Sequence, residues 1–194
     1  MQHGEAICFG RHSAKAGTPV GLAALLAKQY PGKQWSYAGI PGPHRGRYVF
    51  QILDSFERFL RDHGGKCPDS VLISVGGADA AAQTPLIDFQ RGLDALIDRI
   101  RRAGGQQILF VGVLPEPELA RQAEIYQEQL AELARENHVP LLDVLARWIA
   151  EPDWSRRYKL EPEYGAEPNA SVYSATPNGA AREEIAKMIW ERWH

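Results

Sequence analysis

The chain has 194 residues, which is enough for one domain with a sizeable hydrophobic core and does not call for a second. Its 22 lysines and arginines against 24 aspartates and glutamates leave a formal net charge of -2. This balance excludes a global positive field that would recruit nucleic acid or an anionic membrane. We therefore predict a single domain over residues 1–194 whose partners are recognised by a local site.

The amino-terminal residues and the cysteines indicate the compartment. Residues 1–6 are polar, and the first apolar stretch is too short for a signal sequence or a membrane span. We expect a cytoplasmic protein, unless a signal peptide has been removed. The two cysteines, Cys8 and Cys67, fit free thiols better than a disulfide framework, which a chain of this length does not require.

Short apolar runs alternate with longer amphipathic stretches, as is typical of repeated βα units around a parallel sheet. The third and fourth runs are almost entirely apolar, as expected of strands that are covered on both faces. The five predicted strands are residues 6–9, a weak run around 34–37, and residues 70–75, 107–113 and 139–143.

The stretches between these strands carry apolar residues at helical spacing. The most regular of them has a stripe of apolar side chains on one face of the helix and charged residues elsewhere: Phe89, Leu93, Leu96, Ile97 and Ile100. A long loop is predicted over residues 151–175, which hold three prolines and no sustained periodicity. The predicted helices are residues 20–29, 48–62, 86–102 and 118–136, and a last one from Pro177.

Four short motifs, placed after predicted strands or before the last helix, resemble the sequence blocks of the SGNH/GDSL hydrolases, a family of acyl-ester hydrolases. The order and spacing of the four blocks cover essentially the whole chain and are far more specific than any one block. The motifs are Phe9-Gly10-Arg11-His12, residues 37–42, Gly76-Gly77-Ala78-Asp79 and residues 173–179.

The resemblance implies a three-layer α/β/α fold. Its centre would be a five-stranded parallel sheet in the flavodoxin-like order, with helices on both faces. The four motifs would then meet in one cleft at the carboxyl ends of the strands.

The resemblance also implies which positions carry the chemistry, and most of them are replaced. Where the family has an acid and the nucleophilic serine after the first glycine, this chain has Arg11 and His12. Gly39 keeps the glycine whose backbone N–H serves the oxyanion hole. Ala78 stands at the place of the oxyanion-binding asparagine, beside Asp79, which the family motif keeps.

The last motif has lost the acid and the general base of the family, because Tyr173 and Thr176 stand in their places. A threonine cannot accept a proton near neutral pH, and a tyrosine with a pKa of about 10 does not supply the charge of an aspartate. Losing one oxyanion donor alone costs about 3–4 kcal/mol of transition-state stabilisation. We therefore predict that ordinary esterase activity is absent or very weak.

Three alternatives stay open at the first motif. Ser13 follows His12, and a slip of one residue would present its hydroxyl as a nucleophile; otherwise it is a helix-capping serine. His12 is a poor base for its neighbour, but an imidazole titrates near neutral pH and could itself react or bind. Arg11 offers a guanidinium for a carboxylate or phosphate, or an ion pair with Asp79.

These observations leave three functional hypotheses, among which the fold alone does not choose. The first is a degenerate hydrolase that binds a small acylated, sugar-like or anionic ligand, or a protein partner, in the former active-site cleft. The second is an enzyme that uses Ser13, or one that works through His12, Asp79 and Tyr173, and the third is a scaffold. No residues have metal-ligand spacing, so we predict neither metal nor cofactor. The predicted ligand contacts are Arg11, Gly39, Gly77, Ala78, Tyr173 and Thr176.

Overall fold

The sheet is all parallel, and its strands follow the order β2-β1-β3-β4-β5. The computed structural model describes residues 5–9, 22–29, 34–37, 48–114, 118–158 and 179–193. The strands are β1 (Glu5–Phe9), β2 (Gln34–Tyr37), β3 (Ser70–Ser74), β4 (Gln107–Val111) and β5 (Leu141–Leu142). This confirms the predicted α/β class with a parallel sheet, and the strand order is the flavodoxin-like one.

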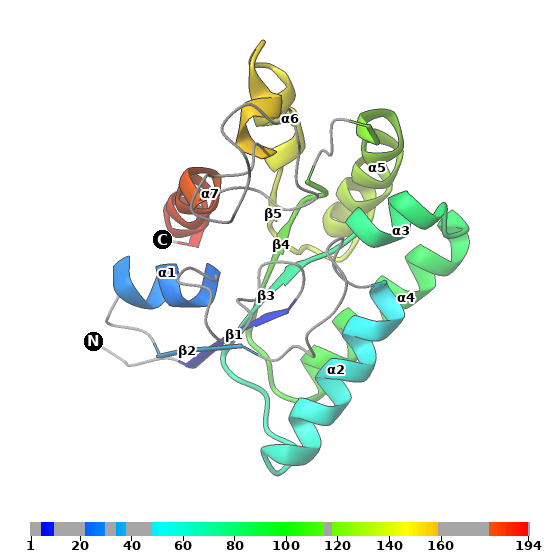
Figure 1. The fold of residues 1–194 in the computed structure, drawn as a ribbon. Helices are drawn as coiled ribbons and strands as arrows, with labels where there is room; N and C mark the ends of the chain where they lie inside the picture. Colours follow the sequence, from blue (N-terminus) through cyan, green and yellow to red (C-terminus); the bar gives the residue numbers. More distant parts are fainter. Residues whose placement is uncertain are drawn as a thin grey trace.

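Helices cover both faces of the sheet, which gives the predicted three layers (Figure 1). Helices α2, α4 and α5 pack on one face, and α1 and α7 pack against each other on the other face. The helices are α1 (Leu22–Gln29), α2 (Val49–Asp62), α3 (Gly77–Ala82), α4 (Leu86–Arg102), α5 (Ala120–Glu136), α6 (Val144–Ile149), the 3-10 helix η1 (Trp154–Tyr158) and α7 (Gly179–Trp193).

The central strands supply apolar side chains to both layers because successive residues of a strand point to opposite faces. Val71 and Ile73 of β3 belong to the cluster under α2, α4 and α5, whereas Leu72 belongs to the cluster under α1 and α7. In the same way, Ile108 and Phe110 of β4 belong to the first cluster, and the other core residues of β4 belong to the second. The unbroken apolar runs of these strands follow from this double burial.

Helix α4 has the predicted bounds, and every residue of its predicted apolar stripe is fully buried. The sequence missed three short elements, which are α3, α6 and η1. The last strand is also shorter than predicted. Asp143 ends it by accepting a hydrogen bond from the Ala146 N–H (2.9 Å), which begins α6 instead of extending β5.

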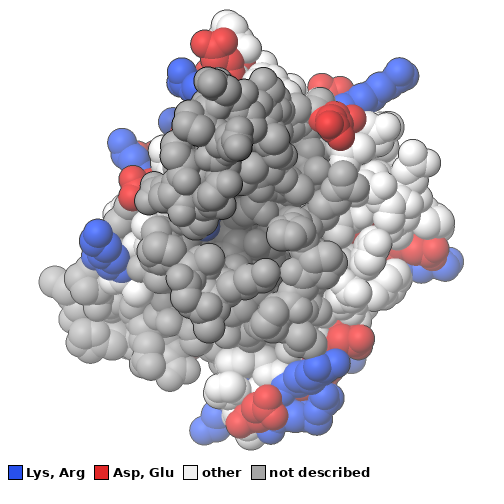
Figure 2. Space-filling view, in the orientation of Figure 1, with Lys and Arg blue, Asp and Glu red and all other residues white. Residues whose placement is uncertain are grey.

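Charged side chains of both signs are scattered around the face shown in Figure 2, as the small net charge suggests. Within the described ranges, no helix combines the length and apolar character needed to cross a membrane. Cys67 carries a free, half-buried thiol. Burial and the nearby charge of Asp69 raise the pKa of the Cys67 thiol to about 11, so it stays protonated at neutral pH.

Helices α2 and α4 approach each other closely at Gly92. A Cβ atom at this position would lie 2.5 Å from Cγ1 and 3.1 Å from Cγ2 of Val49, which is fully buried at the start of α2. A β-branched side chain has little rotamer freedom in a helix, so these methyl groups cannot move aside easily. The glycine is therefore required by packing, although it sits in the middle of a helix.

We expect Gly92→Ala to lower the free energy of unfolding by about 1–2 kcal/mol. Alanine favours a helix by about 1 kcal/mol over glycine, but overpacking against Val49 costs more than that gain. In a Val49→Ala background the obstructing methyls are gone, so the same change should be neutral or stabilising. Urea unfolding of both single variants and the double variant measures this coupling. If Gly92→Ala changed the free energy of unfolding equally in both backgrounds, contact with the Val49 methyl groups would not be the cause of the destabilisation.

Candidate active site

The strands that precede the first three motifs end side by side. Strand β1 ends at Phe9, which is in register with Ile73 of β3, and Cys8 is in register with Tyr37, the last residue of β2. Because the sheet is parallel, these ends lie at its carboxyl edge, where open α/β sheets bind ligands. The frame of the predicted cleft is thus present in the described strands.

Most of the predicted site residues lie outside the described residues. The two predicted catalytic residues of the first motif are among them, as are most of the predicted ligand contacts. Their convergence in one cleft therefore stays a prediction. The residues concerned are Arg11, His12, Ser13, Gly39, Tyr173 and Thr176.

The third motif lies within the described chain and forms the turn from β3 into α3. Gly76 has a φ of 97°, and a Cβ atom there would lie 2.6 Å from Cγ2 of Val113. Both the left-handed backbone and the close contact require glycine at this position. The turn places Gly77, Ala78 and Asp79 in the first turn of α3.

Ala78 is buried, with 7% of its surface exposed, and Gly77 beside it is half-exposed. Neither has a polar side-chain atom. The only donors these two residues can offer are backbone N–H groups, two of the four that a helix start leaves without an intrahelical partner. The third motif therefore forms a tight turn into α3 but carries no side-chain donor at the position where the resemblance implies one.

Asp79 is fully buried and caps α2 across a separation of 30 residues. Its Oδ2 accepts a hydrogen bond from the Val49 N–H (3.1 Å), a group at a helix start that has no intrahelical partner. Its Oδ1 is buried and has no hydrogen-bond partner in the described part of the chain. These contacts give Asp79 a structural role, and its catalytic role stays a prediction.

Burial raises the pKa of the Asp79 carboxyl, against the opposing effects of the Thr84 hydroxyl and the Val49 N–H. The Thr84 N–H donates to the Asp79 carbonyl (3.0 Å), and the Tyr126 hydroxyl donates to the Thr84 carbonyl. Burial and the charge of Asp79 also raise the pKa of Tyr126, so its hydroxyl stays a donor.

The supporting residues Val49, Thr84 and Tyr126 were not predicted as part of the site. Val49 and Thr84 act mainly through backbone groups, which leave no signature in the sequence. Tyr126 shares the apolar spacing of Leu130 and Leu133 on α5, so it reads as core. Its hydroxyl was the only indication in the sequence of a polar role, because a tyrosine hydroxyl on a buried helix face needs a hydrogen-bond partner.

Arg157 joins the two ends of the segment that holds the fourth motif. Its side chain is 8% exposed; Nε donates to Oε2 of Glu184 on α7 (2.9 Å), and Nη1 donates to Oε2 of Glu151 (2.9 Å). The guanidinium also lies over the ring of Trp148, 5.0 Å from its centroid. The two elements that flank residues 159–178, η1 and α7, are thus joined by this ion pair.

A family model described as GDSL-like lipase/acylhydrolase family matches residues 4–175. A search of curated proteins finds no match. The family model thus matches most of the chain.

Solved structures with the same fold are similar over nearly the whole chain. TesA has 18% identity and a TM-score of 0.67, covering 97% of this chain and 96% of its own. The esterase EstA from Pseudoalteromonas sp. has 17% identity and a TM-score of 0.68, covering 98% and 96%. A lipase/acylhydrolase from Enterococcus faecalis has 15% identity and a TM-score of 0.68, covering 96% and 93%. Identities this low show a shared fold.

We expect Asp79→Asn to gain stability relative to the wild type as the pH rises. A carboxyl whose folded pKa is raised stabilises the fold below its ordinary pKa of 3.8, and this contribution is lost as the pH rises through the folded pKa. The asparagine keeps an acceptor oxygen for Val49 and carries no charge. Chemical unfolding from pH 4 to pH 8 measures the difference.

Asp54→Asn provides the matched control, because it removes the same charge from an exposed position on α2. If the stability curves of wild type and Asp79→Asn run parallel over this pH range, the buried carboxyl does not titrate as described.

Proposed function

Because the chain belongs to the GDSL-like lipase/acylhydrolase family, we propose that it keeps the fold of these enzymes but lacks ordinary esterase activity. In this proposal, the former active-site cleft binds a small acylated, sugar-like or anionic ligand, or a protein partner. The ligand would meet the loops after β1, β2 and β3 and the segment before α7.

The observation that carries this proposal is the buried methyl group of Ala78 at the position of the oxyanion-binding asparagine. Acyl transfer places negative charge on the carbonyl oxygen, and fixed donors in the site stabilise that charge. Removing one such donor lowers the rate by about 100-fold to 1000-fold. Gly76 and Asp79 hold the turn in place around Ala78, and within this described turn neither Gly77 nor Ala78 carries a side-chain donor.

The replaced residues of the fourth motif support the same conclusion. A nucleophile, a base and an orienting acid act as a unit, so the loss of one already removes most of the rate enhancement. In this chain Thr176 and Tyr173 occupy the positions of the base and the acid. Near neutral pH, a threonine does not accept a proton and a tyrosine carries no negative charge. The missing oxyanion donor is a separate loss from the missing base and acid, and both support weak or absent hydrolysis.

One sequence feature favours a second candidate, an esterase that uses Ser13. The spacing from Gly10 to Gly17 is one residue longer than the family motif, so Ser13 could take the place of the nucleophile. An esterase of this kind would need a base other than Thr176.

We expect purified wild type to cleave p-nitrophenyl acetate and butyrate at rates near background. His12→Ser alone should stay at background, because base, acid and oxyanion donor are still missing. The combined variant His12→Ser, Ala78→Asn, Tyr173→Asp and Thr176→His should show measurable turnover. Release of p-nitrophenol, followed by absorbance with and without each variant, measures these rates. Saturation-transfer NMR should show the butyrate ester bound to the wild type while it remains uncleaved.

The opposite outcome identifies the esterase. If wild type cleaves the ester at a saturable rate and Ser13→Ala abolishes this activity, the proposal is wrong and Ser13 is the nucleophile. If neither turnover nor ester binding is found, the cleft does not accept acylated ligands of this size.

A further inference from the structure

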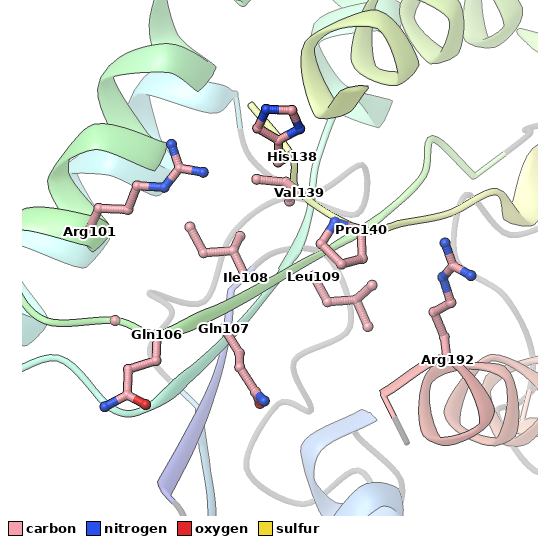
Figure 3. Close-up of a pocket in the computed structure, with 10 residues that line it drawn as sticks. Arg101, Gln106, Gln107, Ile108, Leu109, His138, Val139, Pro140 and Arg192 are labelled. Carbon is pink, nitrogen blue, oxygen red and sulfur yellow. The ribbon is translucent and has the colours of Figure 1, made fainter. Parts of the chain in front are cut away.

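A cavity lies at the edge of the sheet opposite to the turn between β3 and α3. Figure 3 shows the residues that line it. It has a volume of about 290 Å³ and is lined by the first residues of β4, including Gln107, and by residues 138–140 before β5. Since the sheet is parallel, these are amino ends of strands, whereas the turn at Gly76 lies at a carboxyl end. The cavity is therefore separate from the cleft predicted at the carboxyl ends of the strands.

Basic side chains line this cavity, and no carboxylate is among its lining residues in the described chain. Arg101 comes from α4, His138 from the turn before β5, and Arg192 from the last turn of α7. Arg101 donates one N–H to the Asn137 carbonyl, which leaves its other guanidinium donors available. Arg192 makes no hydrogen bond or ion pair within the described ranges, and both arginines are exposed.

The two arginines stand on opposite sides of the cavity. Figure 3 shows Arg101 on one flank and Arg192 on the other, with Ile108, Leu109 and Pro140 between them. The reason is topological, because α4 covers one face of the sheet and α7 covers the other. A single small anion held by one guanidinium would leave the second arginine unused.

The surface between the two arginines mixes apolar and amide side chains. Pro140 is exposed, whereas Ile108, Leu109 and Val139 are 8%, 2% and 6% exposed and add little surface. The exposed amide side chains of Gln106–Gln107 also line the cavity. The cavity thus offers two cationic ends, an apolar ring at Pro140 and amide donors that can pair with a carboxylate.

We propose that this cavity, named here the amino-edge groove, binds a small linear dicarboxylate. Each guanidinium takes one terminal carboxylate through paired N–H donors, and the short carbon chain between them lies against Pro140. A volume of about 290 Å³ accommodates a short chain of this kind. The groove acts independently of the chemistry proposed for the carboxyl edge of the sheet.

Titration calorimetry at low ionic strength tests the proposal with five probes: succinate, adipate, suberate, hexanoate and inorganic phosphate. We expect one dicarboxylate to bind at least about tenfold more tightly than hexanoate and phosphate, because only a dicarboxylate engages both arginines. Arg101→Gln and Arg192→Gln should each weaken that binding by about tenfold or more. Raising the salt concentration should weaken it further.

Matched controls come from the same two helices. Arg102→Gln removes the neighbouring arginine of α4, which pairs with Asp98 (3.7 Å), and Lys187→Gln removes a cation of α7 that pairs with Glu191 (3.9 Å). Neither control residue lines the groove, so dicarboxylate affinity should stay unchanged.

Arg101→Lys and Arg192→Lys separate charge from geometry and give a second pair of well-tolerated surface changes. They should weaken binding less than the glutamine variants, because the charge remains while the paired donors are lost. Three results would overturn the proposal: no dicarboxylate binds, binding survives both glutamine variants, or phosphate binds as tightly as the best dicarboxylate.

Discussion

The position of three helices depends on one residue, Val49, and on the buried hydrogen bond that it makes. Its N–H donates to the Asp79 carboxyl at 3.1 Å, which ties the start of α2 to the first turn of α3. Its two methyl groups face Gly92, which sets the separation between α2 and α4. Because buried polar groups and tight packing both resist displacement, the turn at the end of β3 is held on several sides.

Periodicity predicted most of the fold because burial repeats along the chain. The stripe from Phe89 to Ile100 is buried as expected, and β3 reads as a strand covered on both faces. Periodicity failed where a single hydrogen bond decides the outcome. Asp143 begins α6 after only two residues of β5, and a side-chain cap of this kind competes with strand extension at short range.

The candidate site was only partly predictable, for a different reason. The third motif identified Gly77, Ala78 and Asp79 because the family pattern fixes their spacing. The structural contacts of Asp79 depend on a backbone N–H far away in the sequence, and no side-chain pattern reports such a partner. Likewise, Arg101 and Arg192 resemble ordinary solvated charges such as Arg102 until the sheet brings their helices to the two sides of one groove.

The ion pairs of Arg157 have a consequence for how the carboxyl-terminal part of the fold unfolds. They fasten η1 to α7, because the same guanidinium pairs with Glu151 before η1 and with Glu184 on α7. Breaking a buried ion pair on one side leaves a charge without its partner, which is strongly destabilising. Helix α7 and η1 therefore belong to one cooperative unit of unfolding.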